Sequence, residues 1–104
     1  MKIIKKLCEL IDEELCDAEK YAKLALKYKD EDTELAALFY NLSLEETRHM
    51  NQLHNAVVKK VEEAKASGKD DPRTEGMKIA YDMLHEKAIE EAKEVSVMQS
   101  MYRE

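Results

Sequence analysis

The chain has 104 residues, a length typical of one domain. Hydrophobic residues make up 44% and charged residues 38%, with only two glycines and one proline, which is typical of long amphipathic helices. The formal net charge is −6, and basic residues are interspersed with acidic ones instead of forming a block, which argues against nucleic-acid binding.

Membrane association has no support in the sequence. No apolar stretch approaches the ~20 residues that a membrane-spanning helix needs. The opening segment MKIIKK is too short and too charged for the apolar core of a signal peptide. We therefore expect a cytoplasmic protein with neither membrane nor nucleic acid as a partner.

The first predicted helix covers residues 2–28. Its apolar residues recur at alternating steps of three and four, the period of a helix face packed in a bundle. Glu14 is the one charged residue on this face, which consists of Ile4, Leu7, Ile11, Glu14, Ala18, Tyr21, Ala25 and Tyr28.

A short polar connection leads to the second predicted helix, residues 33–66, which Asp30 or Asp32 is expected to cap. Its main apolar face is interrupted in the middle by Glu46 and His49. A second stripe indicates contacts on two sides, and consists of Ala36, Tyr40, Ser43, Met50, Val57, Val61 and Ala64.

The strongest break in the chain precedes the third predicted helix, residues 72–102. Gly68 suits the position after a helix end, Asp71 suits an N-cap, and Pro72 suits a first helical turn. Glu91 is the charged exception on the apolar face of this helix. Short connections predict an all-α, antiparallel, up-down-up bundle forming one domain over the whole chain.

Cys8 and Cys16 lie on the first predicted helix. Eight residues of helix separate their Cα atoms by ~12 Å, beyond the reach of a disulfide. We expect both to be reduced and half-buried, with a structural role.

The four charged or polar exceptions are predicted to meet. Counting equal distances from the two connections places Glu14, Glu46, His49 and Glu91 within about one helical turn of each other. Glu46 and His49 are also neighbours on one helix face, because they are three residues apart. Converging buried carboxylates repel each other unless a cation is bound between them. Carboxylate oxygen and imidazole nitrogen suit iron or manganese, and zinc also accepts them.

Other readings of these residues remain open. A lone glutamate on an apolar face often fixes helix register or pairs with a lysine. Glu94, one turn beyond Glu91, is a further candidate ligand. Glu19, the Asp82–His85 pair and His54 lie off the predicted level or off the apolar face, and we expect no metal there.

The spacing of these residues resembles the ferritin-like superfamily, and its rubrerythrin-like branch most. In that family a ligand glutamate is followed by tyrosine seven and alanine eleven positions later, as Glu14, Tyr21 and Ala25 are here. A Glu-x-x-His motif follows about 32 residues on, as Glu46 and His49 do. The resemblance covers roughly residues 7–98.

The resemblance implies third-helix ligands at Glu91 and Glu94, and a carboxylate-bridged di-iron site with ferroxidase or peroxide-scavenging activity. The sequence departs from the family by lacking a fourth ligand-bearing helix and the Cys-x-x-Cys pairs of a rubredoxin-like domain. An internal electron relay is therefore not expected.

With three helices, the site is open on one side, so we expect a homo-oligomer, most simply a dimer. The third helix offers an apolar surface for it, comprising Met77, Leu84, Met98 and Met101. Two other hypotheses stay open: a non-catalytic assembly module that has lost a complete metal site, and a helical adaptor unrelated to ferritins.

Overall fold

The structure is a computed structural model that describes the backbone of residues 2–66 and 72–104, and the side chains of these residues apart from 72–81, 83 and 84. Its elements are α1 (Lys2–Tyr28), α2 (Thr33–Ala66) and α3 (Pro72–Arg103). The expectation of an all-α chain with three long helices is confirmed, and the predicted bounds agree to within one residue. The predicted roles of Gly68 and Asp71 lie outside the described residues.

Asp32 is the cap of α2. Its Oδ1 accepts a hydrogen bond from the backbone N–H of Leu35 at 3.1 Å, and its carbonyl oxygen accepts one from Ala36 at 2.9 Å. These contacts satisfy donors that a helix start leaves without an intrahelical partner. Of the two aspartates considered as caps, the structure selects Asp32.

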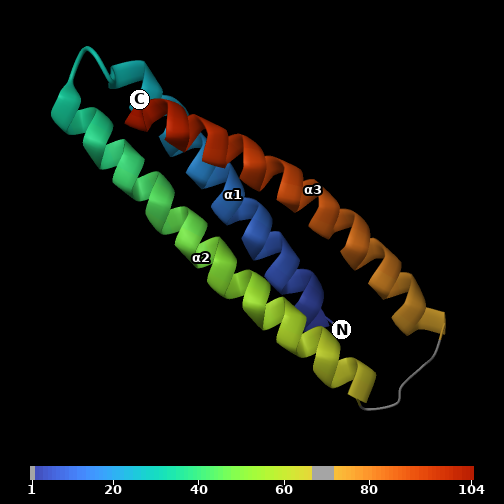
Figure 1. Cartoon of the computed structure of the whole chain (residues 1–104). Helices are drawn as coiled ribbons and strands as arrows, with labels where there is room; N and C mark the ends of the chain where they lie inside the picture. The colour runs from blue at the N-terminus through green and yellow to red at the C-terminus, as the bar shows by residue number, and fades with distance from the viewer. Residues whose placement is uncertain (1, 67–71) are drawn as a thin grey trace.

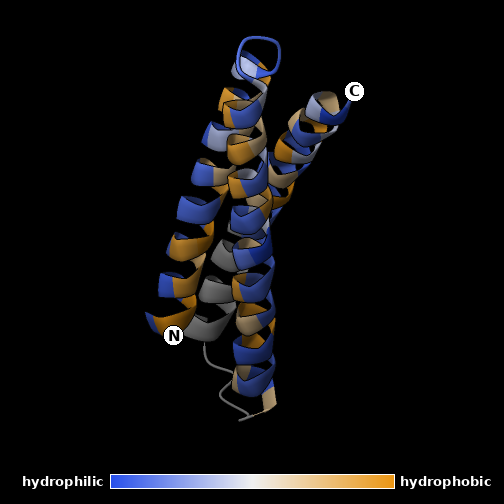
Figure 2. Ribbon diagram, turned by 90° about the vertical axis from the view of Figure 1, so that its left-hand side faces the viewer, coloured by the Kyte–Doolittle hydropathy of each residue, from blue (hydrophilic) through white to orange (hydrophobic). Residues whose placement is uncertain are grey.

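The three helices lie side by side in an elongated body with extents of 56 × 18 × 17 Å. Figure 1 shows that α1 and α3 run in one direction and α2 in the other, with the α1–α2 connection and the C-terminus at the same end. Figure 2 shows that α3 is inclined to the α1–α2 pair. Accordingly α1 packs closely along α2, whereas α2 and α3 approach each other at few points.

The core lies along α1, which is the most buried helix. Its buried residues recur at helical spacing and are Ile4, Ile11, Leu15, Ala18, Ala22 and Ala25. In the C-terminal half of α1 these residues are alanines, Ala18, Ala22 and Ala25, whose small side chains allow neighbouring backbones to approach closely. Leu15 and Val57 are almost fully buried in the apolar core, and each such side chain contributes about 1.5–3 kcal/mol through loss of apolar surface to water.

A buried polar network joins all three helices. The Ser43 hydroxyl donates to the carbonyl oxygen of Ala18 on α1 at 2.7 Å. The Gln99 amide of α3 donates to the Ser43 and Thr47 hydroxyl oxygens at 3.0 and 3.2 Å. Thr47 in turn donates to the Ser43 carbonyl at 3.0 Å. Because buried polar groups are costly without partners, these bonds favour one axial register of the three helices.

Candidate metal centre

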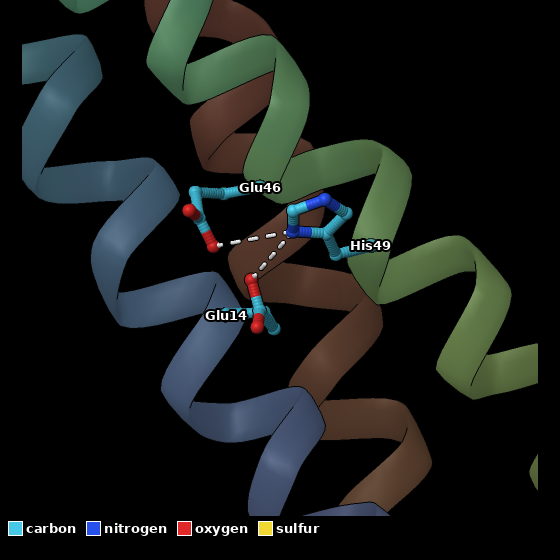
Figure 3. A group of neighbouring side chains, drawn as sticks. All are labelled: Glu14, Glu46 and His49. Carbon is cyan, nitrogen blue, oxygen red and sulfur yellow. Dashed lines mark ion pairs between the residues drawn. The ribbon is translucent and has the colours of Figure 1, made fainter.

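Glu14, Glu46 and His49 meet between α1 and α2. Each offers one ligand atom, and these atoms all lie within 4.8 Å of one another. The Nδ1 atom of His49 is 3.5 Å from Oε2 of Glu14 and 3.9 Å from Oε2 of Glu46. Figure 3 shows the two carboxylates, one from each helix, directed toward the same imidazole. Among the residues that the structure describes, this is the one group with three such side chains.

Local helix geometry and helix pairing together place these side chains. Glu46 and His49 are on one face of α2 because they are three residues apart. The Ser43–Ala18 hydrogen bond fixes the antiparallel register of α2 on α1. Glu46 is three residues after Ser43 on α2. In an antiparallel pair it therefore faces the residue three before Ala18 on α1, which is residue 15, adjacent to Glu14.

The cluster is partly shielded from water. The side chains of Glu14 and Glu46 are 26% and 20% exposed, and that of His49 is 52% exposed. The Oε2 atom of Glu14 is buried and has no hydrogen-bond partner. A buried carboxylate oxygen without a partner is costly, and a second carboxylate nearby adds repulsion, so a bound cation would relieve both costs.

The spacing is compatible with a metal ion. Ligands about 2.1 Å from a common ion lie at most about 4.2 Å apart. The 3.5 and 3.9 Å separations between His49 Nδ1 and the two carboxylates fall below that limit, and all three ligand atoms lie within 4.8 Å, so a small adjustment of the side chains would bring them onto one ion. They also exceed the usual length of a charge-assisted hydrogen bond, about 2.7–2.9 Å. Two carboxylate oxygens and one imidazole nitrogen form a donor set suited to iron or manganese.

Glu91 and Glu94, the two candidate ligands on α3, do not join this group. The contacts Ser43–Gln99 and Tyr40–Tyr102 set the register of α3 on α2. Counting back along α3 from them places residue 96, and not Glu91, opposite Glu46. For Glu91 the shift of five residues corresponds to ~7.5 Å along the helix. Glu94 is only two residues from residue 96, but its side chain is exposed. The sequence count assumed a symmetrical turn between α2 and α3, which this register does not follow. Ligation by Glu91 and Glu94 stays a prediction.

Glu19 and Glu94 both act on the side chain of Lys23. The Lys23 ammonium pairs with Glu19 at 2.9 Å, and its pKa is raised mainly by the hydrogen bond and charge of Glu19, with a smaller contribution from Glu94. Glu19 therefore forms a surface ion pair within α1.

The three further residues that the sequence places off the predicted level, Asp82, His54 and His85, do not belong to the cluster. His54 and His85 stack with ring centroids 4.7 Å apart, which the sequence did not predict. Asp82 is exposed. Tyr21 stacks on Phe39 at 6.3 Å, in an aromatic row that continues to Tyr28.

Both cysteines are free, but their surroundings differ. Cys8 is half-buried as expected, and burial, with a smaller effect of Asp12, raises the pKa of its thiol. Cys16 is exposed, so the expectation of half-burial is wrong for it. The reason is that α1 turns its 15, 18 and 22 positions toward the core, which leaves residue 16 outward.

Three residues next to the cluster were missed as a group. Ser43, Thr47 and Gln99 form the buried network one turn from Glu46. The available signal was Ser43 on the second apolar stripe of α2. A buried hydroxyl needs a partner, and its partner on α3 depends on a register that the sequence does not specify.

Comparisons with protein-family models, with curated proteins and with solved structures found no match to this chain. In the part of the chain that the structure describes, no helix combines the length and apolar character needed to cross a membrane.

Proposed function

We propose that Glu14, Glu46 and His49 bind a divalent transition-metal ion, with iron favoured. The observation that carries this proposal is the Oε2 atom of Glu14, which is buried and without a hydrogen bond beside a second carboxylate and an imidazole. A bound cation would offset the repulsion between the two carboxylates and would be coordinated by the unsatisfied Oε2 atom of Glu14. Manganese and zinc accept the same ligands.

The activity that we propose follows from the ferritin-like resemblance of these residues. It is oxidation of ferrous iron by oxygen, or removal of peroxide, at a carboxylate-bridged di-iron site. One chain brings together three ligands, whereas di-iron sites in helical bundles use several glutamates and two histidines. A second copy of the chain would supply the missing ligands, so the proposed site is completed by self-association.

Exposed apolar residues on α3 support this association. Val97 and Met101 lie one turn apart on α3 and are 59% and 49% exposed. Apolar side chains that are neighbours on a helix surface form a patch suited to an interface. Of the other residues expected on this surface, Met98 is half-buried, and the side chains of Met77 and Leu84 lie outside those described.

Anaerobic calorimetric titration of metal-free protein with ferrous iron tests the metal site. Wild type is expected to bind iron saturably. Glu46→Gln and Glu14→Gln are each expected to weaken binding at least about tenfold, because each replaces a charged ligand by a neutral side chain of similar size. The matched controls are Glu45→Gln and Glu13→Gln, which change the preceding, exposed glutamates. Equal affinity in all five proteins, or no saturable binding by wild type, would contradict the proposal.

The principal alternative is a non-catalytic assembly module. It is favoured by the absence of Glu91 and Glu94 from the cluster, which leaves each chain with an incomplete donor set. Under this alternative His49, when protonated, pairs with the two glutamates and fixes the register of α1 on α2. Iron-dependent oxygen consumption that Glu46→Gln abolishes and Glu45→Gln retains would exclude it.

A further inference from the structure

A second candidate site lies beside the metal cluster, in a groove bordered by all three helices. Its volume is about 420 Å³, within the range of about 300–1,000 Å³ typical of small-molecule sites. The described lining residues are Cys8, Ile11, Met50, Asn51, His54, His85, Ala88, Ile89, Ala92, Lys93 and Ser96.

The floor of the groove is apolar and firmly held. Ile11 is buried in the main core, and Met50, Ala88 and Ala92 pack against that core. Polar side chains, exposed to solvent, line the rim: Asn51 on α2, and Lys93 and Ser96 on α3. An apolar floor with a few polar groups at its edge is the usual composition of a site for a small amphipathic molecule.

The charged residues in the described lining of the groove differ from those of the protein as a whole. The chain carries a formal net charge of −6, yet the described lining includes no aspartate or glutamate. The pKa of His54 is lowered by partial burial and by neighbouring His85, which favours the uncharged form of His54. Lys93 is then the principal formal charge in the described lining, and it attracts an anionic head group.

The dimensions of the groove indicate the shape of the molecule. The lining positions on α3 run from His85 to Ser96, a distance of ~16 Å along the helix. A volume of about 420 Å³ over that length gives a mean width of roughly 8 Å between the walls, once the radius of a water molecule is added on each side. An α-helix with its side chains is about 10–12 Å wide, so a helix of a second copy does not fit inside, whereas an extended alkyl chain does.

We propose that this groove binds a free medium-chain aliphatic carboxylate, with the carboxylate at Lys93 and the alkyl chain running over Met50 and Ala92 toward Ala88. This site needs neither a metal ion nor the proposed di-iron chemistry. It therefore stands or falls independently of the function proposed above.

Titration of metal-free protein with decanoate in the presence of EDTA tests the proposal, by calorimetry and by amide NMR shifts. Wild type is expected to bind one equivalent with a dissociation constant of about 0.1 mM, and the shifts are expected to map to the groove. Lys93→Glu is expected to weaken binding at least tenfold. The matched control Lys87→Glu changes an exposed lysine of α3 outside the groove by the same charge, and is expected to bind within twofold of wild type.

Two further arms separate the contributions of the head group and the chain. Decanol is expected to bind wild type more weakly than decanoate, and equally well to wild type and Lys93→Glu. Ala92→Leu fills the groove and is expected to abolish binding of both, with its circular dichroism unchanged. If this variant does not fold, the exposed Lys93 and Lys87 variants still decide the question.

Four results would overturn the proposal. The first is the absence of saturable decanoate binding below about 1 mM. The second is equal decanoate affinity of Lys93→Glu and wild type, and the third is equal weakening of decanoate binding by Lys87→Glu and Lys93→Glu. The fourth is a set of NMR shifts that map outside the groove. Equal binding of Glu46→Gln and wild type would support it, because that result separates the groove from the metal cluster.

Discussion

The surroundings of Glu14 bear on whether the cluster binds a metal ion or holds a structural ion pair. Its Oε2 atom is buried without a hydrogen bond, and its carboxylate faces that of Glu46 across His49. If the cluster binds a cation, the facing carboxylates destabilise the metal-free protein, as functional sites often do. If the cluster is structural, Glu14 stabilises the fold through His49.

Glu14→Gln is therefore expected to stabilise the metal-free protein by about 0.5–1 kcal/mol at pH 8, because it removes one of two repelling charges. The same variant is expected to lose most of the stabilisation that wild type gains from added metal. Urea unfolding with EDTA and with excess metal measures both quantities, and Glu13→Gln is the control. Destabilisation of metal-free Glu14→Gln would contradict the repulsion on which the cation site is argued.

His54 predicts a dependence of stability on pH. Burial and the neighbouring His85 lower its pKa in the folded protein below the ordinary value of 6.5. The unfolded chain therefore takes up a proton at higher pH than the folded chain does. Above the ordinary value His54 has no effect on stability, and stability falls as the pH drops below 6.5, until the folded-state pKa is passed.

Urea unfolding of the EDTA-treated protein between pH 7.5 and 5 checks this. His54→Gln is expected to show a shallower loss of stability over that range than wild type, because the titrating group is absent. The other titratable or charged groups of the surrounding groove, Cys8, His85 and Lys93, are unchanged in this variant. An identical pH profile for the two proteins would count against the lowered pKa.

At the scale of the helices, the polar network of Ser43, Thr47 and Gln99 holds the register on which the cluster depends. Ser43→Ala is expected to destabilise the protein by about 1–2 kcal/mol, because the Ala18 carbonyl and the Gln99 amide each lose a partner. Gln99→Leu removes the donor on α3. The double variant is expected to cost less than the sum of the single ones, since both act on one network.

Urea unfolding of the four proteins gives this double-mutant cycle. Ser100→Ala is the control for α3, since Ser100 is exposed and bonds to Arg103 on the same helix. Strict additivity of the Ser43 and Gln99 effects would show that the network does not couple α2 to α3.

The helices themselves could be predicted because their determinants are local. Apolar periodicity, the acidic connection with Asp32 and the rarity of glycine and proline define the bounds. Glu46 and His49 could be paired by spacing alone, and Glu14 by counting across a short connection. The position of α3 could not, because its register depends on side-chain contacts such as Ser43–Gln99 and Tyr40–Tyr102. The stacking of His54 on His85 depends on the same register.

At the scale of the whole molecule, the question is what covers the open side of the cluster. His49 remains 52% exposed, and each chain contributes three side chains to the cluster. A site for oxygen chemistry works best where bulk water is excluded and the ligands are held on several sides. A symmetric dimer would provide both, because the same patch serves on each copy.

We therefore expect self-association at micromolar concentration, strengthened by ferrous iron. Val97→Glu, on the exposed face of α3, is expected to shift the protein toward monomer and to weaken iron binding with it, although Val97 lies outside the cluster. The matched control Lys87→Glu adds negative charge elsewhere on α3 and is expected to leave both properties unchanged. Light scattering coupled to size exclusion measures the mass. A value near that of one chain, 12.1 kDa, unchanged by iron, would refute dimerisation and leave at most a mononuclear site in each chain.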